Sequence, residues 1–128
     1  RGVLGEGGAT QFIPEGCEAC KTMPHLTPWM SWNLQHDPGL KLGMFSAYED
    51  MVIAGTFLML DSQVFKKALL EETAKVVDTA PERAKRFLVS GTQHTIGDLH
   101  KTAVGDESMA DWLRQMLQGD KAWDNVLQ

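Results

Sequence analysis

Two acidic residues and one histidine follow two apolar runs of the sequence. Glu49 and Asp50 come directly after the run at 40–48, and His94 comes shortly after the run at 86–91. A histidine that takes a proton from a serine needs a carboxylate beside it, which holds the imidazole in one tautomer and stabilises the cation that forms. These residue types suit the acid and base of a hydrolytic triad, with His94 as base, Asp50 as first choice for the acid and Glu49 as second.

The same residues also have a purely structural interpretation. His94 can form hydrogen bonds within its own loop, and Asp50 can cap the helix that is expected after it. The residues alone leave both interpretations open.

A metal site is the third possibility for this region. His94 and His100 are separated by six positions with Asp98 between them, which is neither a helical pair nor a recognised ligand spacing. We therefore expect no metal and no cofactor. His25 and His36 stand beside prolines and are expected to be surface or structural residues.

Two strands and two helices are expected to position the acid and the base. The apolar runs 40–48 and 86–91 predict strands, the first of them covered on both faces. Residues 51–60 are apolar nearly all round and predict a buried helix. Residues 63–77 are amphipathic and predict a second helix, whose core side carries Phe65, Leu69, Val76 and Val77.

Helices are also expected before the first strand and at the end of the chain. Residues 27–35 predict a short helix, with Thr27 as N-cap and Trp29, Met30 and Trp32 packed against the rest of the protein. Residues 106–119 predict the last helix, which Asp106 caps and Gly119 ends. Its core residues are expected to be Met109, Trp112, Leu113, Met116 and Leu117.

The order strand, helix, helix, strand, loop, helix predicts an α/β protein with parallel strands flanked by helices. Two strands are too few for a parallel sheet buried on both faces, and at best the N-terminal segment adds one more. We therefore expect that another chain completes the sheet, or that this chain is one part of a larger fold. Residues 1–15 are expected to be flexible, and residues 16–128 to form the folded part.

Composition limits the classes of partner. The 128 residues are 43% hydrophobic and 23% charged, which fits one globular domain. The net charge of −5, with both signs interspersed, argues against a nucleic-acid partner. No apolar run approaches the roughly 18 residues of a membrane span. The chain opens at Arg1 without a methionine, and both a cleaved precursor and a tag remnant fit that start.

Cys17 and Cys20 are the two cysteines of the chain. A structural disulfide is the first interpretation, and a redox-active pair or half of a zinc site are the alternatives. A disulfide would indicate an oxidising compartment.

Taken together, several motifs resemble the C-terminal part of bacterial pectinacetylesterase-like proteins, the family that includes plant pectin acetylesterases and the animal carboxylesterase Notum. The resemblance covers the chain from Cys17 onward. Its motifs are the Cys-x-x-Cys pair before an aromatic segment, the stretch FSAYEDMVI, the Gly-Thr-x-His-Thr of residues 91–95, and an Asp-Trp-Leu helix followed by Gly119-Asp120 and Trp123.

The resemblance implies a secreted serine esterase of α/β-hydrolase fold, extracellular or periplasmic. It assigns the base to His94 and the acid to Asp50, or to Glu49 if the alignment is shifted by one residue. The chain departs from the family at the nucleophile, because none of its serines stands in a Gly-x-Ser-x-Gly motif.

This departure implies that the serine and the oxyanion donors lie on a separate N-terminal chain of the same precursor, so that the enzyme is a heterodimer acting on an ester substrate. Two alternatives stay open. The chain can be a non-catalytic partner subunit that docks through its sheet edge. It can also be a redox or metal protein built on the two cysteines.

Overall fold

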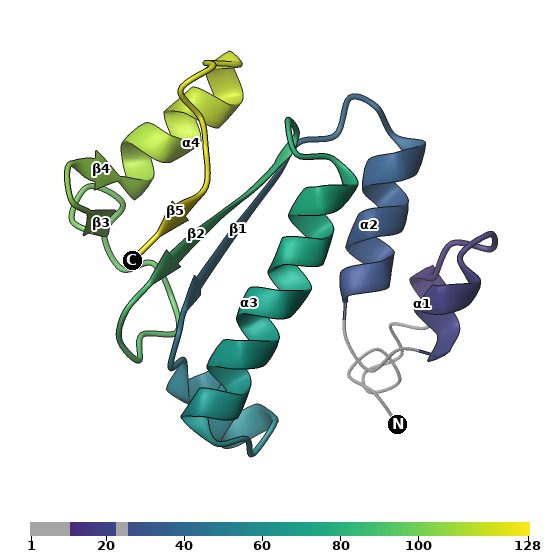
Figure 1. Ribbon diagram of the computed structural model, residues 1–128, viewed down its shortest axis with the longest axis horizontal. Coiled ribbons are helices and arrows are strands. Elements are labelled where there is room, and N and C mark those ends of the chain that lie inside the picture. The colour runs from purple at the N-terminus through teal and green to yellow at the C-terminus, as the bar shows by residue number, and fades with distance from the viewer. Residues whose placement is uncertain (1–10, 23–25) are drawn as a thin grey trace.

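The computed structural model describes residues 11–22 and 26–128. His25 and most of the segment 1–15 that was expected to be flexible lie outside these residues. The elements are α1 (Glu18–Thr22), α2 (Thr27–His36), β1 (Leu42–Ala47), the π-helix η2 (Met51–Phe57), α3 (Ser62–Thr79), β2 (Ala84–Val89), β3 (Ala103–Val104), β4 (Glu107–Ser108), α4 (Met109–Gln118) and β5 (Val126–Leu127) (Figure 1).

The main sheet is parallel and has the strand order β1-β2-β5. Strands β1 and β2 pair along their whole length, from Leu42 opposite Ala84 to Ala47 opposite Val89. This confirms the predicted α/β architecture with parallel strands flanked by helices. The third strand is β5, near the C-terminus, whereas the sequence had offered only the N-terminal segment for a further strand. A strand of two residues is too short to be recognised from the periodicity of the sequence.

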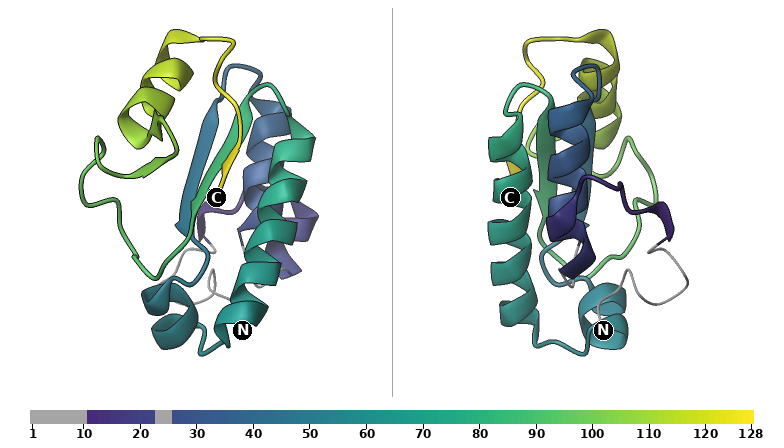
Figure 2. Two further views of the ribbon diagram at one scale, coloured as in Figure 1. Left: turned by 60° about the vertical axis from the view of Figure 1, so that its left-hand side comes forward. Right: turned by 90° about the vertical axis from the view of Figure 1, so that its right-hand side faces the viewer.

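Helices cover both faces of the sheet, as predicted for the first strand. Helices α2 and α3 lie on one face and α4 lies on the other (Figure 2). Side chains alternate between the faces because the strand repeat is two residues. On the α4 face, Phe87 and Val89 pack with Trp112. On the other face, Ala84 packs with Val76.

Helix α3 is the longest helix of the described chain and matches the helix predicted at 63–77. The side chain of Asp61 caps it by accepting a hydrogen bond from the backbone N–H of Gln63 at 2.9 Å. The predicted core residues Phe65, Val76 and Val77 are buried, while Leu69 is half-buried.

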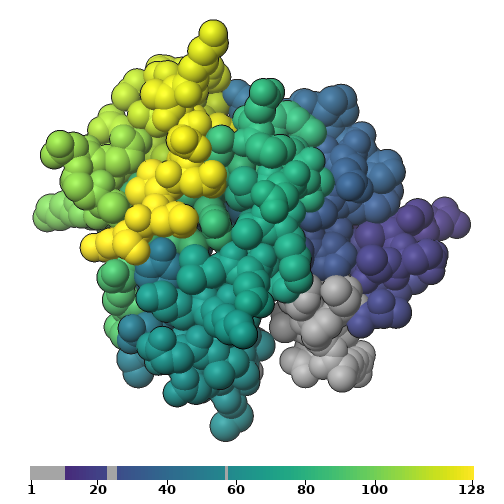
Figure 3. All heavy atoms as spheres, viewed as in Figure 1, coloured from purple at the N-terminus to yellow at the C-terminus, as the bar shows by residue number. Residues whose placement is uncertain are grey.

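The prediction of a buried helix at 51–60 is wrong. A π-helix forms there, and among its described side chains only Ala54 is buried. Met51 is 64% exposed and Met59 is 84% exposed. The segment lies beyond the end of β1 and contributes to the surface near the start of α3 (Figure 3). Its composition predicted burial, but the described residues supply too few neighbours to cover it.

Helix α4 confirms part of its prediction. Met109 and Trp112 are 1% exposed, and Gly119 ends the helix in the left-handed conformation with φ 66°. The N-cap is Ser108, whose hydroxyl accepts the backbone N–H of Asp111, so the cap predicted at Asp106 is wrong. The core position predicted at Leu117 is also wrong, because Leu117 is 78% exposed.

Helix α2 begins where it was predicted, but Thr27 is not its N-cap. Thr27 is the first helical residue, and the N-cap position belongs to Leu26, which has no capping side chain. Trp29 remains 38% exposed. Trp32 stacks on His36 with ring centroids 3.8 Å apart, and His36 Nδ1 lies 2.8 Å from the carbonyl oxygen of Trp32. His36 is therefore a structural surface residue, as expected.

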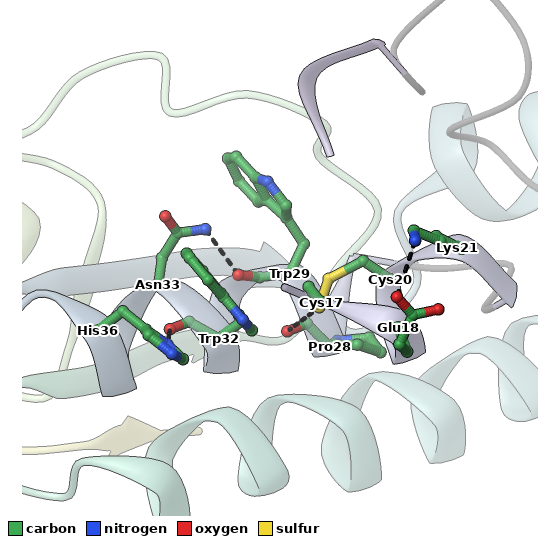
Figure 4. Close-up of a disulfide and its surroundings, with 9 residues drawn as sticks. All are labelled: Cys17, Glu18, Cys20, Lys21, Pro28, Trp29, Trp32, Asn33 and His36. Carbon is green, nitrogen blue, oxygen red and sulfur yellow. Dashed lines mark hydrogen bonds and ion pairs between the residues drawn. A yellow bond between two sulfur atoms is a disulfide. The ribbon is translucent and has the colours of Figure 1, made fainter. Parts of the chain in front are cut away.

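Cys17 and Cys20 form a disulfide beside the start of α2 (Figure 4). Both residues are buried, and Cys17 Sγ lies 4.0 Å from the carbonyl oxygen of Pro28. The pair is therefore a disulfide, as the first interpretation predicted, and neither cysteine is free to bind zinc. Among the described residues, none of the helices is both long and apolar enough to cross a membrane.

Candidate active site

The candidate site lies where β1 and β2 end. The strands are adjacent, parallel and in register, so the loops that follow them leave the same edge of the sheet. Asp50 stands in the loop after β1 and His94 in the loop after β2. Ligands and catalytic groups gather at this edge in open α/β sheets.

The carboxylate of Asp50 contacts the imidazole of His94. Nδ1 of His94 lies 3.0 Å from Oδ2 of Asp50 and 3.2 Å from Oδ1. A carboxylate can only accept a hydrogen bond, so this contact requires a proton on Nδ1. In the neutral ring, Nε2 then carries a lone pair and is free to accept a proton. The side chain of His94 is 40% exposed and that of Asp50 is 5% exposed, so a buried acid supports an accessible base.

Backbone groups of η2 hold the acid in place. Oδ1 of Asp50 accepts hydrogen bonds from the N–H groups of Val52 and Ile53, both at 2.9 Å. Asp50 is thus the N-cap of η2 and the partner of His94 at the same time. The cap interpretation is confirmed for this residue, and the contact with His94 that the triad interpretation requires is present. An Asp before a predicted helix is the signal that indicates this cap, which the sequence had left open as an alternative to the triad.

The same contacts determine the pKa of Asp50. Burial raises the pKa of this carboxyl. Its contacts lower the pKa by more than burial raises it: the hydrogen bond from Ile53, the hydrogen bond and charge of His94, and the hydrogen bond from Val52. The net result is a pKa below the usual 3.8. The carboxylate therefore stays ionised beside the imidazole at neutral pH.

Backbone hydrogen bonds join the two loops. The N–H of Glu49 donates to the carbonyl of Gly91 at 3.0 Å, and the N–H of Met51 donates to the carbonyl of Thr92 at 3.3 Å. Gly91 has φ 109°, a conformation that side chains disfavour, and this conformation lets the second loop turn toward the first. Glu49 is exposed and has no side-chain contact with His94. Of the two predicted acids, the structure brings only Asp50 to His94.

Asp98 and His100, the other residues considered as metal ligands, form no hydrogen bond with Asp50 or His94 among the described contacts. The carboxylate of Asp98 accepts the backbone N–H of His100 at 2.9 Å, and His100 is exposed. No group of three His, Cys, Asp or Glu side chains suited to a metal occurs among residues 11–22 and 26–128.

A polar hollow of about 450 Å³ lies along the loop after β2, and His94 is not among its described lining residues. Gln93 and Thr95, the neighbours of His94 in the loop, line it together with Asp98, Lys101 and Gln128. Its lining carries amide, hydroxyl and charged groups.

A nucleophile is not part of this arrangement. Within the described part of the chain, no side chain forms a hydrogen bond with Nε2 of His94. Ser46, which lies in β1 near the site, donates its hydroxyl to the carbonyl of Ala47 at 3.1 Å. The described residues thus supply an acid and a base and leave the proton-accepting nitrogen open.

Comparisons with protein-family models, with curated proteins and with solved structures find no match to this chain. The resemblance to pectinacetylesterase-like proteins therefore stays a prediction from motifs. The fold and the geometry of Asp50 and His94 are what a functional hypothesis must rest on.

Proposed function

We propose that this chain provides the acid and base of a serine carboxylic-ester hydrolase. His94 is the base and Asp50, rather than Glu49, is the acid. The nucleophilic serine and the oxyanion donors lie on a separate polypeptide, the N-terminal chain of the same precursor. In that assembly the sheet described above is the C-terminal part of an α/β-hydrolase sheet that the other chain completes.

The reaction needs only transfers that this pair can perform. Nε2 of His94 takes the proton of the serine hydroxyl while the serine oxygen attacks the ester carbonyl. The same proton then passes to the leaving alcohol, which leaves an acyl-serine. Water, deprotonated by His94, releases the acid product and restores the serine. Asp50 stabilises the imidazolium in each step.

The contact between Asp50 and His94 is the observation that carries this proposal. It combines an ionised, buried carboxylate, a proton held on Nδ1 and an open Nε2. The Cys17–Cys20 disulfide is consistent with an extracellular or periplasmic location.

The tautomer of His94 tests the acid assignment on this chain alone. At about pH 9, where an ordinary imidazole is neutral, ¹⁵N NMR should show the proton of His94 on Nδ1. In Asp50→Asn, the two backbone N–H groups keep the amide oxygen at the Oδ1 position. The amide nitrogen then faces Nδ1 and can only donate, so we expect the proton to move to Nε2.

His100 is the internal control, because it has no contact with Asp50 and its ring signals should be the same in both proteins. A wild-type His94 with its proton on Nε2 would show that Asp50 does not hold the ring as proposed.

Labelling of the serine tests the base assignment in the complete enzyme. A fluorophosphonate probe should label a second polypeptide that copurifies with this chain, and that complex should hydrolyse p-nitrophenyl acetate. In His94→Ala we expect both rates to fall on the order of a thousandfold or more. His100→Ala, a histidine from the same region outside the site, should retain them. Labelling that is equally fast in both variants would refute the assignment.

A second function is favoured by the outer edge of the sheet. Within the described chain, β1 pairs only with β2, so its other edge has no strand beside it. Such an edge is suited to pairing with another polypeptide, and the chain would then be a non-catalytic partner subunit. Full activity of the complex after Asp50→Asn and His94→Ala would favour this alternative.

A further inference from the structure

A half-open apolar pocket lies between the sheet and the helices α2 and α3. Its volume is about 460 Å³, within the range of about 300–1,000 Å³ that is usual for small-molecule sites. Helices α2 and α3 cover this face of the sheet, and η2 lies at the strand ends (Figure 2). Its walls include Met30, Met44, Ile53, Phe65, Leu69 and Leu88.

Among its described lining residues, the pocket offers no side chain with a free hydrogen-bond donor. Its polar side chains are those of Ser46 and Thr73. Ser46 donates to the carbonyl of Ala47, while Thr73 donates to the carbonyl of Leu69 at 2.7 Å and accepts from Arg86 at 2.9 Å. None of the described residues that line the pocket is charged. A ligand group that accepts hydrogen bonds would therefore lose those from water without replacement by these side chains.

We infer that this pocket binds an uncharged aliphatic molecule. At roughly 30 Å³ for a group the size of a water molecule, it holds about fifteen non-hydrogen atoms. Leu26 and Leu58 line it and are 42% and 40% exposed, so they mark its mouth. A polar end group of the ligand remains in water at this mouth. The inference does not depend on ester hydrolysis.

The pocket is structurally linked to the candidate active site through Ile53. The side chain of Ile53 lines the pocket, and its backbone N–H donates to Oδ1 of Asp50 at 2.9 Å. Ligand atoms in the pocket therefore contact the same turn that holds the carboxylate. The pocket and the polar hollow along the loop after β2 share no described lining residue.

Titration with 1-decanol, an uncharged aliphatic probe, tests the inference by NMR of the methyl groups. We expect saturable shifts at Ile53, Leu69 and Leu88, together with nuclear Overhauser contacts from the decanol chain to these methyls. Met59 and Leu117, which are apolar, exposed and outside the pocket, should not respond. Shifts that do not saturate, or that are as large at Met59 and Leu117, would overturn the inference.

Two variants of α3 complete the test. Leu69→Trp fills the pocket and should weaken decanol binding at least tenfold. Ala68→Trp places the same side chain on the exposed side of the helix and should change the affinity less than twofold. Equal affinities in the two variants would contradict the assignment. If Leu69→Trp does not fold, the nuclear Overhauser contacts between decanol and the pocket methyl groups of the unmodified chain still decide the test.

Discussion

At the scale of single residues, Asp50 has two functions that reinforce each other. Its Oδ1 caps η2 by accepting from two backbone N–H groups, and its Oδ2 is the oxygen nearer to Nδ1 of His94, at 3.0 Å against 3.2 Å for Oδ1. The cap orients the carboxylate, and the orientation determines which oxygen faces the imidazole. A single aspartate is thus both part of the fold and part of the candidate site. This coupling predicts that substitutions of Asp50 change stability as well as any activity.

The pH dependence of stability should report the ionisation of Asp50. Its pKa is lowered in the folded chain, so its stabilising contribution is complete above the ordinary pKa of about 3.9. That contribution is lost as the pH falls through the lower folded value. In Asp50→Asn, the free energy of unfolding should fall less steeply than in wild type below about pH 5. Urea unfolding across this pH range measures the difference.

His94→Gln serves as the control for that experiment. It removes the imidazole but keeps the hydrogen bonds from Val52 and Ile53, so its slope should lie between those of wild type and Asp50→Asn. Asp50→Ala, which also removes the cap, should cost about 1 kcal/mol more than Asp50→Asn. Identical slopes in wild type and Asp50→Asn would show that the carboxylate is not stabilised as described.

At the scale of elements, close packing between β1 and α4 depends on a glycine. A Cβ placed on Gly43 would lie 3.0 Å from Cζ3 of Trp112 and 3.3 Å from Sδ of Met116. Trp112 is 1% exposed, contacts Phe87 edge-on and donates its ring N–H to the carbonyl of Asp124. The indole therefore has little room to move. The glycine in the middle of a strand is explained by this approach.

Gly43→Ala should destabilise the chain by about 1–3 kcal/mol, because the added methyl group overpacks a core that cannot yield. Gly55→Ala is the matched control, since a Cβ at Gly55 meets no atom within 4 Å. The control should be neutral or stabilising by up to about 1 kcal/mol. Chemical denaturation of the two variants measures the contrast. Equal effects would show that the contact with Trp112 is not what requires glycine.

At the scale of the whole molecule, segments far apart in the chain build the three layers. Residues 126–127 complete the sheet beside β2, and Trp123 packs against Trp112 with ring centroids 5.7 Å apart. The disulfide, by contrast, joins residues that are close in sequence and lies beside α2 (Figure 4). It therefore constrains the start of α1 more than the sheet.

Removal of the disulfide should have a limited effect. A crosslink over so short a loop contributes about 2 kcal/mol or less by the loop-entropy relation. Cys17→Ser with Cys20→Ser should lower the free energy of unfolding by that amount and leave the NMR signals of His94 unchanged. A reducing agent should destabilise wild type but not the double variant. Loss of the whole fold on reduction would contradict this local role.

The sequence by itself determined the elements whose patterns are long. It predicted β1 and β2 from continuous apolar runs, and α3 and α4 from apolar residues at helical spacing, because these patterns persist over enough residues to be recognised. It also placed Asp50 and His94 together, because parallel strands that end at one edge bring their loops together. The disulfide was the first interpretation of the two closely spaced cysteines, because the sequence has no second pair of metal ligands at zinc-site spacing.

Only the tertiary structure decided the rest. Glu49 and Asp50 are adjacent and carry the same acidic group, so the sequence does not distinguish them. The backbone hydrogen bonds of η2 and of the loop after β2 determine which of them faces His94. The exposure of 51–60 depends on which other segments reach it, and composition carries no such information. The two-residue strand β5 exists because β2 offers it a partner across the fold, so no local pattern could have indicated it.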